Sequence, residues 1–438
     1  MPSGFIAQLP DAVAIGVGRG NGILQMAVVI NLKRQWNFCQ VAKAVRGLVT
    51  SYPILGCRYS MGFWRDRWLP CLEFPIEQAL KVEDGVTDVD ERENFHVSSF
   101  IDPEKGWPVR FVLLNHSQNS RLLIIFPHLL GDGNAGLTVA QGLGAWLYST
   151  GLPANIHMNR GILQLAKALG FRSIPTLAGE LLREASKIFY MPFMGRWDQG
   201  FKRTENLSGR MNYHKVAIKD SAFKNFSACL KKHNATINDG LASIMAAIVN
   251  RRSNSSWTGT IYTVNLRRFL KDPGPIIGNM SGVNTLPLMI KPGTSMEDLI
   301  AMVAVRTGEH KNRLPGIAFG LLPLISFGWM PHGLLHAFYR TVFGKMIDWQ
   351  SRRTAIFTNI GSMDSYLEPF GSDVITACML GVFQRGLRVP VVMATGFRES
   401  LTVSVCSADD LSKENVAGLA ADWREAVGKF ADINGIRS

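Results

Sequence analysis

The segment His128-Leu129-Leu130-Gly131-Asp132-Gly133 combines residue types that could carry out proton-transfer chemistry. A histidine has a pKa near neutral, so its ring can accept a proton from an alcohol or an amine. The glycines leave room for a substrate, and an acid four residues after the histidine can help to fix the turn. The spacing therefore makes His128 a candidate general base, with Asp132 and Gly133 as parts of the same site.

His128 has two alternative roles. A single histidine is often a structural residue whose ring is hydrogen bonded to the backbone. Metal binding is disfavoured, because no second histidine or carboxylate lies nearby at ligand spacing. The general base is favoured by the setting of His128 at the end of an apolar strand expected at 121–127 and before a glycine turn.

Asp132 also has two interpretations. In a catalytic triad its carboxylate would hold the imidazole ring. A side chain four residues away across a glycine turn more easily points back into the protein, where it would pair with a cation. Arg267 or Arg268, directly after a strand expected at 260–264, is the candidate partner, since a bidentate pair would lock the turn. The alternative is that both arginines are exposed on a loop.

Other chemical motifs are weak or absent. The sequence contains no Gly-x-Ser-x-Gly and no phosphate-binding Gly-x-x-x-x-Gly-Lys-Ser/Thr, and no Gly-x-Gly-x-x-Gly follows a strand, which disfavours serine hydrolysis, nucleotide hydrolysis and dinucleotide redox chemistry. Asp239 is expected to cap a helix. Asn359 lies between an apolar strand and a glycine turn, where its amide could contact a substrate or an oxyanion, or merely close the turn.

Length and charge bound the organisation and the partners. A chain of 438 residues is expected to form two lobes of roughly 200 residues each, here 1–205, with the motif and a connecting region, and 206–438. The net charge of +13 favours an acidic or phosphorylated partner: coenzyme A, an acidic carrier protein or an anionic membrane surface. The basic residues are scattered in pairs, so nucleic acid is disfavoured.

The six cysteines are widely spread and form no metal-binding cluster, so we expect a reduced, cytoplasmic compartment and no metal. No secretory signal is present. The stretch from Leu314 to Tyr339 has no charged residue, but its prolines and glycines would break a membrane-spanning helix. We interpret it as broken helices packed in the protein, with peripheral membrane contact as the alternative.

Hydrophobic periodicity predicts alternating strands and helices. The segment 86–94, which is acidic and polar, is expected to be a loop. Asn134 is expected to cap the helix that follows the motif. The expected strands are residues 23–32, 55–59, 62–69, 109–114, 121–127, 213–218, 260–264, 389–397 and 401–406, and the expected helices are residues 38–50, 134–148, 163–169, 177–189, 221–233, 238–251 and 413–430.

Six segments in this order resemble the chloramphenicol acetyltransferase-like superfamily, which includes nonribosomal peptide condensation domains, wax ester synthases and alcohol O-acyltransferases. The resemblance covers nearly the whole chain. The segments are Tyr52-Pro53-Ile54-Leu55-Gly56-Cys57-Arg58-Tyr59, Phe126-Pro127-His128-Leu129-Leu130-Gly131-Asp132-Gly133, Ala235-Thr236-Ile237-Asn238-Asp239, Val264-Asn265-Leu266-Arg267, Ile277-Gly278-Asn279 and Thr358-Asn359-Ile360-Gly361.

The resemblance implies an α/β (α+β) fold of two similar lobes with a tunnel between them. His128 would accept a proton from the nucleophile, and Asp132 would be structural and paired with Arg267. The acyl donor would be a thioester of coenzyme A or of a phosphopantetheinyl carrier protein, with no tightly bound cofactor. Many condensation domains have two consecutive histidines where this chain has Pro127-His128, so an ester or a simple amide is favoured over a peptide bond.

The sequence thus favours a freestanding acyltransferase that acts on a small-molecule or lipid acceptor. The alternative is a condensation-like module without catalytic activity, which binds an acyl-carrier partner in the same tunnel.

Overall fold

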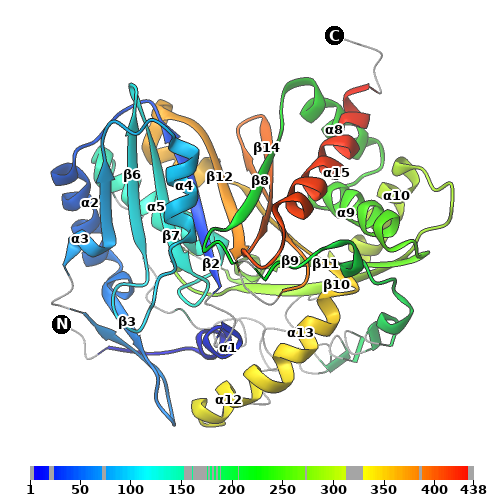
Figure 1. Ribbon diagram of the computed structural model, residues 1–438, viewed down its shortest axis with the longest axis horizontal. Helices are drawn as coiled ribbons and strands as arrows, with labels where there is room; N and C mark the ends of the chain where they lie inside the picture. The colour runs from blue at the N-terminus through cyan, green and yellow to red at the C-terminus, as the bar shows by residue number, and fades with distance from the viewer. Residues whose placement is uncertain are drawn as a thin grey trace.

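The computed structural model describes residues 4–18, 24–71, 75–151, 160, 175, 178, 179, 182, 183, 186, 187, 189–205, 207–271, 274–311, 329–383 and 387–432. Two large sheets, of five and six strands, form the centres of two lobes, and helices cover both sheets (Figure 1). The expected α/β class with two sheet-containing lobes is confirmed. The expected helices at 163–169 and 177–189 fall in the part of the chain of which little or nothing is described.

The five-stranded sheet carries the motif. Its strand order is β12-β2-β7-β6-β5, and all neighbours are antiparallel except β5 and β6. The strands are β2 (Gln25–Leu32), β5 (Leu80–Glu83), β6 (Arg110–His116), β7 (Asn119–Pro127) and β12 (Val374–Phe383). Since β12 comes from the second half of the sequence, the first lobe is completed by a strand that lies beyond residue 206. The boundary expected between a first lobe at 1–205 and a second lobe at 206–438 stays a prediction.

Strand β2 is apolar throughout because both faces of its sheet are covered. Val28 and Ile30 pack with helices α2 (Phe38–Ser51) and α5 (Gly133–Tyr148), whereas Ala27 and Val29 face a second apolar cluster beneath α4 (Val89–Ser98). Helix α2 begins at a capping box of Asn37 and Gln40, as its sequence favours. The strand and both helices lie where the periodicity predicts them.

The expectation of a loop at 86–94 is wrong for residues 89–94, because these belong to helix α4. Asp88 caps the helix by accepting a hydrogen bond from the Glu91 N–H at 2.8 Å. Its polar composition hid the helix, since one of the residues it buries completely is a carboxylate, Glu93. A buried charge needs partners, and these come from distant parts of the chain.

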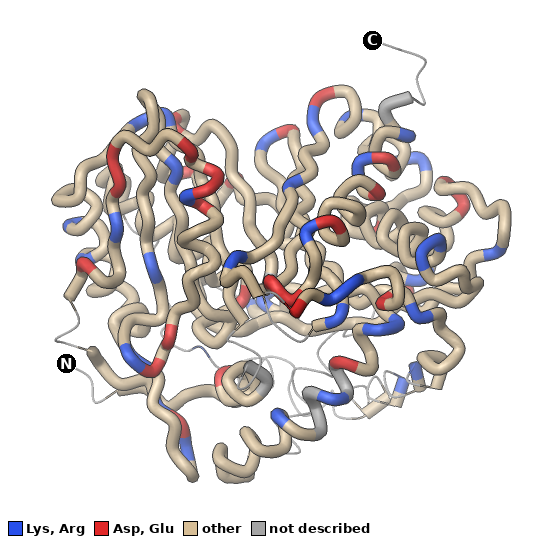
Figure 2. Tube along the Cα trace, viewed as in Figure 1, with Lys and Arg blue, Asp and Glu red and all other residues tan. Residues whose placement is uncertain are grey.

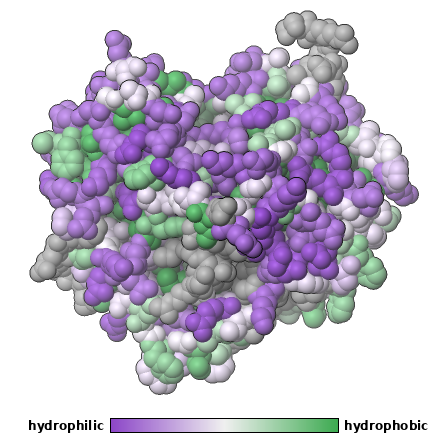
Figure 3. All heavy atoms as spheres, viewed as in Figure 1, coloured by the Kyte–Doolittle hydropathy of each residue, from purple (hydrophilic) through white to green (hydrophobic). Residues whose placement is uncertain are grey.

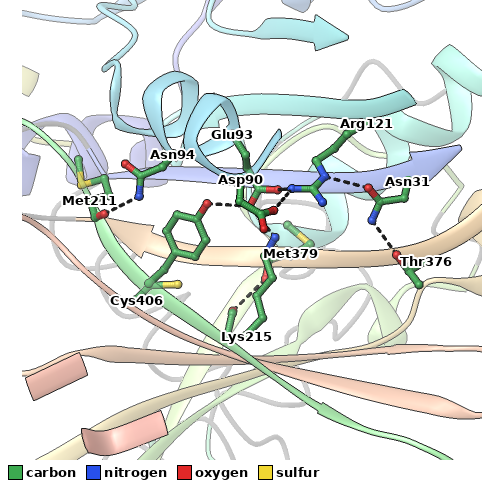
Figure 4. Close-up of polar contacts among 12 residues, drawn as sticks. Asn31, Asp90, Glu93, Asn94, Arg121, Met211, Lys215, Thr376, Met379 and Cys406 are labelled. Atoms are coloured by element: carbon green, nitrogen blue, oxygen red, sulfur yellow. Dashed lines mark hydrogen bonds and ion pairs between the residues drawn. The ribbon is translucent and has the colours of Figure 1, made fainter. Parts of the chain in front are cut away.

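Glu93 joins the two lobes (Figure 4). Its carboxylate accepts hydrogen bonds from the Arg121 guanidinium at 2.6 Å, the Tyr213 hydroxyl at 2.8 Å and the Lys215 ammonium at 2.5 Å. Arg121 lies on β7, whereas Tyr213 and Lys215 lie on β8 (Asn212–Ile218) of the other sheet. Burial and the charge of Glu93 raise the pKa of Tyr213, so its phenol stays a hydrogen-bond donor.

The six-stranded sheet has the order β10-β9-β11-β13-β14-β8, and helices from the same half of the chain cover it. Strands β10 and β12 fall in stretches for which no strand was expected. The remaining strands are β9 (Trp257–Asn265), β10 (Ser281–Met289), β11 (Thr354–Ser362), β13 (Val391–Phe397) and β14 (Ser400–Ser407), and the covering helices are α8 (Asp220–Lys232), α9 (Ile237–Ser253), α10 (Met296–Lys311) and α15 (Lys413–Asp432).

A small third sheet lies below the first lobe in Figure 1, near helices from distant parts of the chain. Of the apolar stretch from Leu314 to Tyr339, residues 314–328 lie outside the described residues, and the rest contains a short helix. No helix in the described part of the chain is long and apolar enough to cross a membrane. The strands are β1 (Phe5–Ile6), β3 (Cys57–Ser60) and β4 (Arg67–Pro70), and the helices are α1 (Leu9–Gly18), α12 (His332–Phe338) and α13 (Gly344–Ser351).

Replacing Glu93 should destabilise the junction between the lobes. We expect Glu93→Ala to lower the free energy of unfolding by about 3–5 kcal/mol, because Arg121 and Lys215 would lose their buried counter-charge. Urea denaturation measures this. The matched control is Glu91→Ala on the same helix, whose 54% exposed side chain pairs with Arg210 at the surface and should contribute less than about 1 kcal/mol. Equal stability of the two variants would contradict the role of Glu93.

Candidate active site

His128 directly follows strand β7, and its backbone is held on both sides. Its N–H donates to the Leu24 carbonyl at 2.6 Å, and its carbonyl accepts from the Asn279 side-chain amide at 2.9 Å. Leu129 and Leu130, the next two residues, are 1% exposed and pack into the core of the first lobe. The position of the histidine is therefore fixed by backbone contacts and by its neighbours, without use of its ring.

The imidazole of His128 is half-buried, and it makes no hydrogen bond or ion pair with any other residue that the structure describes. In a structural histidine, the ring nitrogens would be expected to form such bonds. Both nitrogens are thus free, within the described structure, to meet a substrate.

Asp132 is buried at the start of helix α5, and its carboxylate accepts hydrogen bonds from several parts of the chain. One carboxylate oxygen caps the helix by accepting from the Ala135 N–H at 3.0 Å, so the expectation that Asn134 caps this helix is wrong. The other oxygen accepts from Arg267 at 2.8 Å, from the Met280 N–H at 2.8 Å and from the Ser281 hydroxyl at 3.0 Å. The carboxylate does not bond to the His128 ring, so the two do not form a triad in this structure.

Of the two arginines offered by the sequence, Arg267 is the partner of Asp132. Arg267 is 5% exposed and also donates to the carbonyls of Ile276 and Gly278, at 3.1 and 3.0 Å. The Arg268 guanidinium instead lies over the ring of Phe269. Burial would raise the pKa of Asp132, but the Arg267 charge, together with the hydrogen bonds to the carboxylate, holds that pKa below its ordinary value. The Asp132 carboxylate is therefore ionised at neutral pH.

A second buried ion pair, which the sequence reasoning missed, holds the same turn from the other side. Arg160 donates to Asp11 of α1 at 3.0 Å, to the Leu130 carbonyl at 2.7 Å and to the Ile277 carbonyl at 2.8 Å. Asp11 also accepts from the Trp68 indole at 3.0 Å. A single arginine in a connecting segment gives no signal in the sequence, whereas Asn279 lay in a segment of the resemblance but had no role assigned.

Gly133 lies where the two lobes touch. A Cβ atom at this position would stand 2.4 Å from Cδ1 of Ile360, on strand β11. A side chain at this position would therefore have to displace the end of the Ile360 side chain.

Asn359 closes a turn. Its side-chain oxygen accepts from the Gly361 N–H at 3.0 Å, and Gly361 has a φ of 88°, which favours glycine. Asn359 makes no described contact with His128, although its neighbour Ile360 meets Gly133. Asp239 likewise caps a helix, by accepting from the Thr236 N–H at 2.8 Å.

No group of three His, Cys, Asp or Glu side chains within the described ranges is placed to hold a metal ion. Among the described residues, the site offers the half-buried imidazole of His128 and the polar groups around it.

No protein-family model matches the sequence, and no curated protein matches it either. Solved structures do match. The first condensation domain of the calcium-dependent antibiotic synthetase, in complex with a substrate analogue, superposes with a TM-score of 0.70 at 12% identity, over 99% of this chain and 98% of that one.

The chain has the condensation-domain fold. Polyketide synthase associated protein 5 from Mycobacterium tuberculosis is also similar, with a TM-score of 0.64 at 13% identity over 100% of both chains. A variant of the starter condensation domain of rhizomide synthetase, in complex with C8-CoA and Leu-SNAC, gives a TM-score of 0.65 at 13% identity over 98% of this chain and 94% of that one. The α/β fold with two sheet-containing lobes that the resemblance implies is thus confirmed.

The contact of Gly133 with Ile360 predicts a specific rescue. Gly133→Ala should lower the free energy of unfolding by about 1–3 kcal/mol, because the new methyl group overlaps Cδ1 of Ile360. Ile360→Val removes that atom, so the double variant should be more stable than Gly133→Ala alone. Thermal or urea denaturation of both single variants and the double variant measures this coupling. Strictly additive effects would contradict the contact.

The ion pair of Asp132 predicts a pH-dependent stability. Asp132→Asn should lower the free energy of unfolding at pH 7 by about 3–5 kcal/mol, since Arg267 stays buried without its counter-charge. The pKa of Asp132 is depressed in the folded state, so its contribution is present above the ordinary value of about 4 and is lost as the pH falls below it. The difference between wild type and variant should therefore shrink in acid, as urea denaturation at several pH values would measure. A difference that stays constant would contradict the pairing.

Proposed function

We propose that this protein is an acyltransferase, which moves an acyl group from a thioester to an alcohol or an amine. The observation that carries the proposal is the His128 imidazole: it is half-buried, without a described hydrogen-bond partner, and held at the junction of the two lobes by a rigid turn. A general base needs these properties, because its ring nitrogen must be unoccupied and its position must be fixed.

In the proposed reaction, a ring nitrogen of His128 accepts the proton of the acceptor hydroxyl or amine while the acceptor atom attacks the thioester carbonyl carbon. The tetrahedral intermediate then collapses, the carbon–sulfur bond breaks, and the imidazolium returns the proton to the leaving thiolate. Asp132 and Arg267 act on the backbone of the turn, so we assign them a structural role. The oxyanion would be stabilised by a backbone N–H near Gly133 at the start of α5, or by the Asn359 amide.

The thioester donor is proposed to be acyl-coenzyme A or an acylated phosphopantetheinyl carrier protein, which would reach His128 through a tunnel between the lobes. The complex of the rhizomide synthetase starter domain with C8-CoA and Leu-SNAC supports this class of donor. The net charge of +13 also suits an acidic carrier protein or the phosphates of coenzyme A. The single histidine after Pro127 favours an ester or a simple amide as product.

Removing the base should remove the chemistry and leave the fold intact. We expect His128→Ala to lower turnover about 10²- to 10⁴-fold, because a positioned general base contributes on that order. Its melting temperature should change little, since no described side-chain bond is lost. The assay is the release of free thiol from acyl-coenzyme A or acylated carrier protein, with a panel of alcohols and amines.

The control variant is His116→Ala, a histidine at the far end of the adjacent strand β6, which should retain wild-type turnover. Thiol release that needs both an acceptor and His128 supports the acyltransferase. Wild-type turnover in His128→Ala would contradict the base. Binding of an acyl-carrier protein without thiol release for any acceptor would favour the module without catalytic activity.

A further inference from the structure

One end of the molecule carries large apolar side chains that are exposed to solvent. Trp64 and Trp329 are 72% and 74% exposed, and Phe63 is 58% exposed. The hairpin of β3 and β4 and the helix α12 both project at the lower edge of the molecule in Figure 1, and green and white atoms gather there in Figure 3. We call this surface the aromatic tip; it consists of Ile6, Phe63, Trp64, Trp329 and Leu334.

The aromatic tip is one surface made of two distant parts of the chain. The Phe63 carbonyl accepts from the Gly333 N–H at 2.9 Å, and the Trp64 carbonyl accepts from the His332 N–H at 3.2 Å. These are the first two N–H groups of helix α12, which have no partner within the helix. Gly333 permits the approach, since a Cβ atom there would lie 2.9 Å from the Phe63 ring.

A buried polar cluster fixes the base of the hairpin to the helix. The fully buried Asp66 carboxylate accepts from the Tyr59 hydroxyl at 2.5 Å, lies 2.8 Å from Nε2 of His336 and accepts from the Gly62 N–H at 2.9 Å. The Asp66 N–H donates to Nδ1 of His332 at 3.0 Å. Burial would raise the pKa of Asp66, but the hydrogen bonds that its carboxylate accepts, including those from His336, Tyr59 and the Gly62 N–H, hold it well below its usual range. The carboxylate thus stays charged and bonded.

This anchoring holds the aromatic side chains outward. The bonds from the N-terminus of α12 fix the backbone of Phe63 and Trp64 in a projecting turn, and both side chains are exposed there. A rigid apolar surface in water is costly, and patches of this kind mark interaction sites. Two tryptophans at neighbouring projecting turns favour a membrane interface, where the indole ring sits between headgroups and acyl chains.

The charges around the aromatic tip have one sign. Arg65, Arg67, Arg340 and Lys345 are exposed, whereas the one acidic residue within 61–70 and 329–345 is the buried Asp66 (Figure 2). Arg340 also lines a groove of about 310 Å³ between the hairpin and α12. A surface with projecting aromatic residues and a cationic rim is complementary to an anionic lipid bilayer.

We propose that the aromatic tip binds anionic membranes. Trp64, Trp329 and their neighbours enter the headgroup region, and the cationic side chains lie against lipid phosphates. The proposal is independent of the acyl-transfer chemistry, because none of these residues belongs to the turn that holds His128.

Co-sedimentation with vesicles of phosphatidylcholine, alone or mixed with phosphatidylglycerol, tests the proposal. We expect the wild-type protein to bind the mixed vesicles, and the variant Trp64→Ser/Trp329→Ser to bind them at least about tenfold more weakly. The matched control is Phe189→Ser/Phe193→Ser, which removes two aromatic residues that are 77% and 69% exposed elsewhere, and it should bind as the wild type does. Unchanged melting temperatures would show that the variants are folded.

A second pair of variants tests the charge. Arg340→Gln/Lys345→Gln should weaken binding to mixed vesicles about tenfold or more, since each cation near an anionic surface contributes to binding, whereas Lys231→Gln/Lys232→Gln on helix α8 should have little effect. Three results would overturn the proposal: no binding of the wild type to mixed vesicles, equal binding of the tip and control variants, or a dimer in sedimentation velocity that the tip variant dissociates while vesicles leave the wild type in solution. None of these results depends on whether His128→Ala abolishes acyl transfer, so the two proposals can fail separately.

Discussion

The ion pair between Asp132 and Arg267 is the contact on which the arrangement of this site depends. It lies between the lobes, buried from water, and the carboxylate also caps helix α5 and accepts from Met280 and Ser281. A charge pair in such a place is costly to desolvate, so it contributes to a stable fold only when its geometry is nearly complete. Since both oxygens of the carboxylate are used, the turn after β7 is held by several bonds at once, and these restrain the backbone near His128.

Two guanidinium groups donate hydrogen bonds to the backbone of residues 276–278, the segment that lies opposite the motif. Arg267 binds the carbonyls of residues 276 and 278, and Arg160 binds the carbonyl of residue 277 between them. Arg160 also reaches the Leu130 carbonyl, so the first lobe, the N-terminal helix and the second lobe meet at a few consecutive peptide groups. The histidine ring takes no part in this network. The six residues of the motif thus divide into two parts: the backbone and Asp132 hold the turn, and the imidazole makes no described hydrogen bond.

The sequence predicted the parts of the fold that local pattern decides. The strand at 25–32, the capped helix after it and the hairpin of β6 and β7 follow from periodicity and turn residues, and the pairing of Asp132 with one of two arginines followed from spacing. The parts that depend on distant partners were missed. Helix α4 buries a carboxylate whose partners are far along the chain, β12 pairs with a strand from the other end, and Arg160 stands alone in its segment. None of these leaves a periodic signal, because the compensating contact is made only after folding.

The strand exchange through β12 also decides when the first lobe can fold. Asn31 on β2 donates a hydrogen bond to Thr376 on β12, 345 residues later. Strand β12 also pairs with the side of β2 that faces away from β7, and without β12 that side of β2 would be an open sheet edge. A growing chain on the ribosome therefore cannot complete the five-stranded sheet until residue 383 has emerged. By then four of the six strands of the second sheet have been synthesised, and β13 and β14 have not. Both lobes must then close late and almost together. For a cell, the interval before closure is the period in which this chain most needs protection from aggregation.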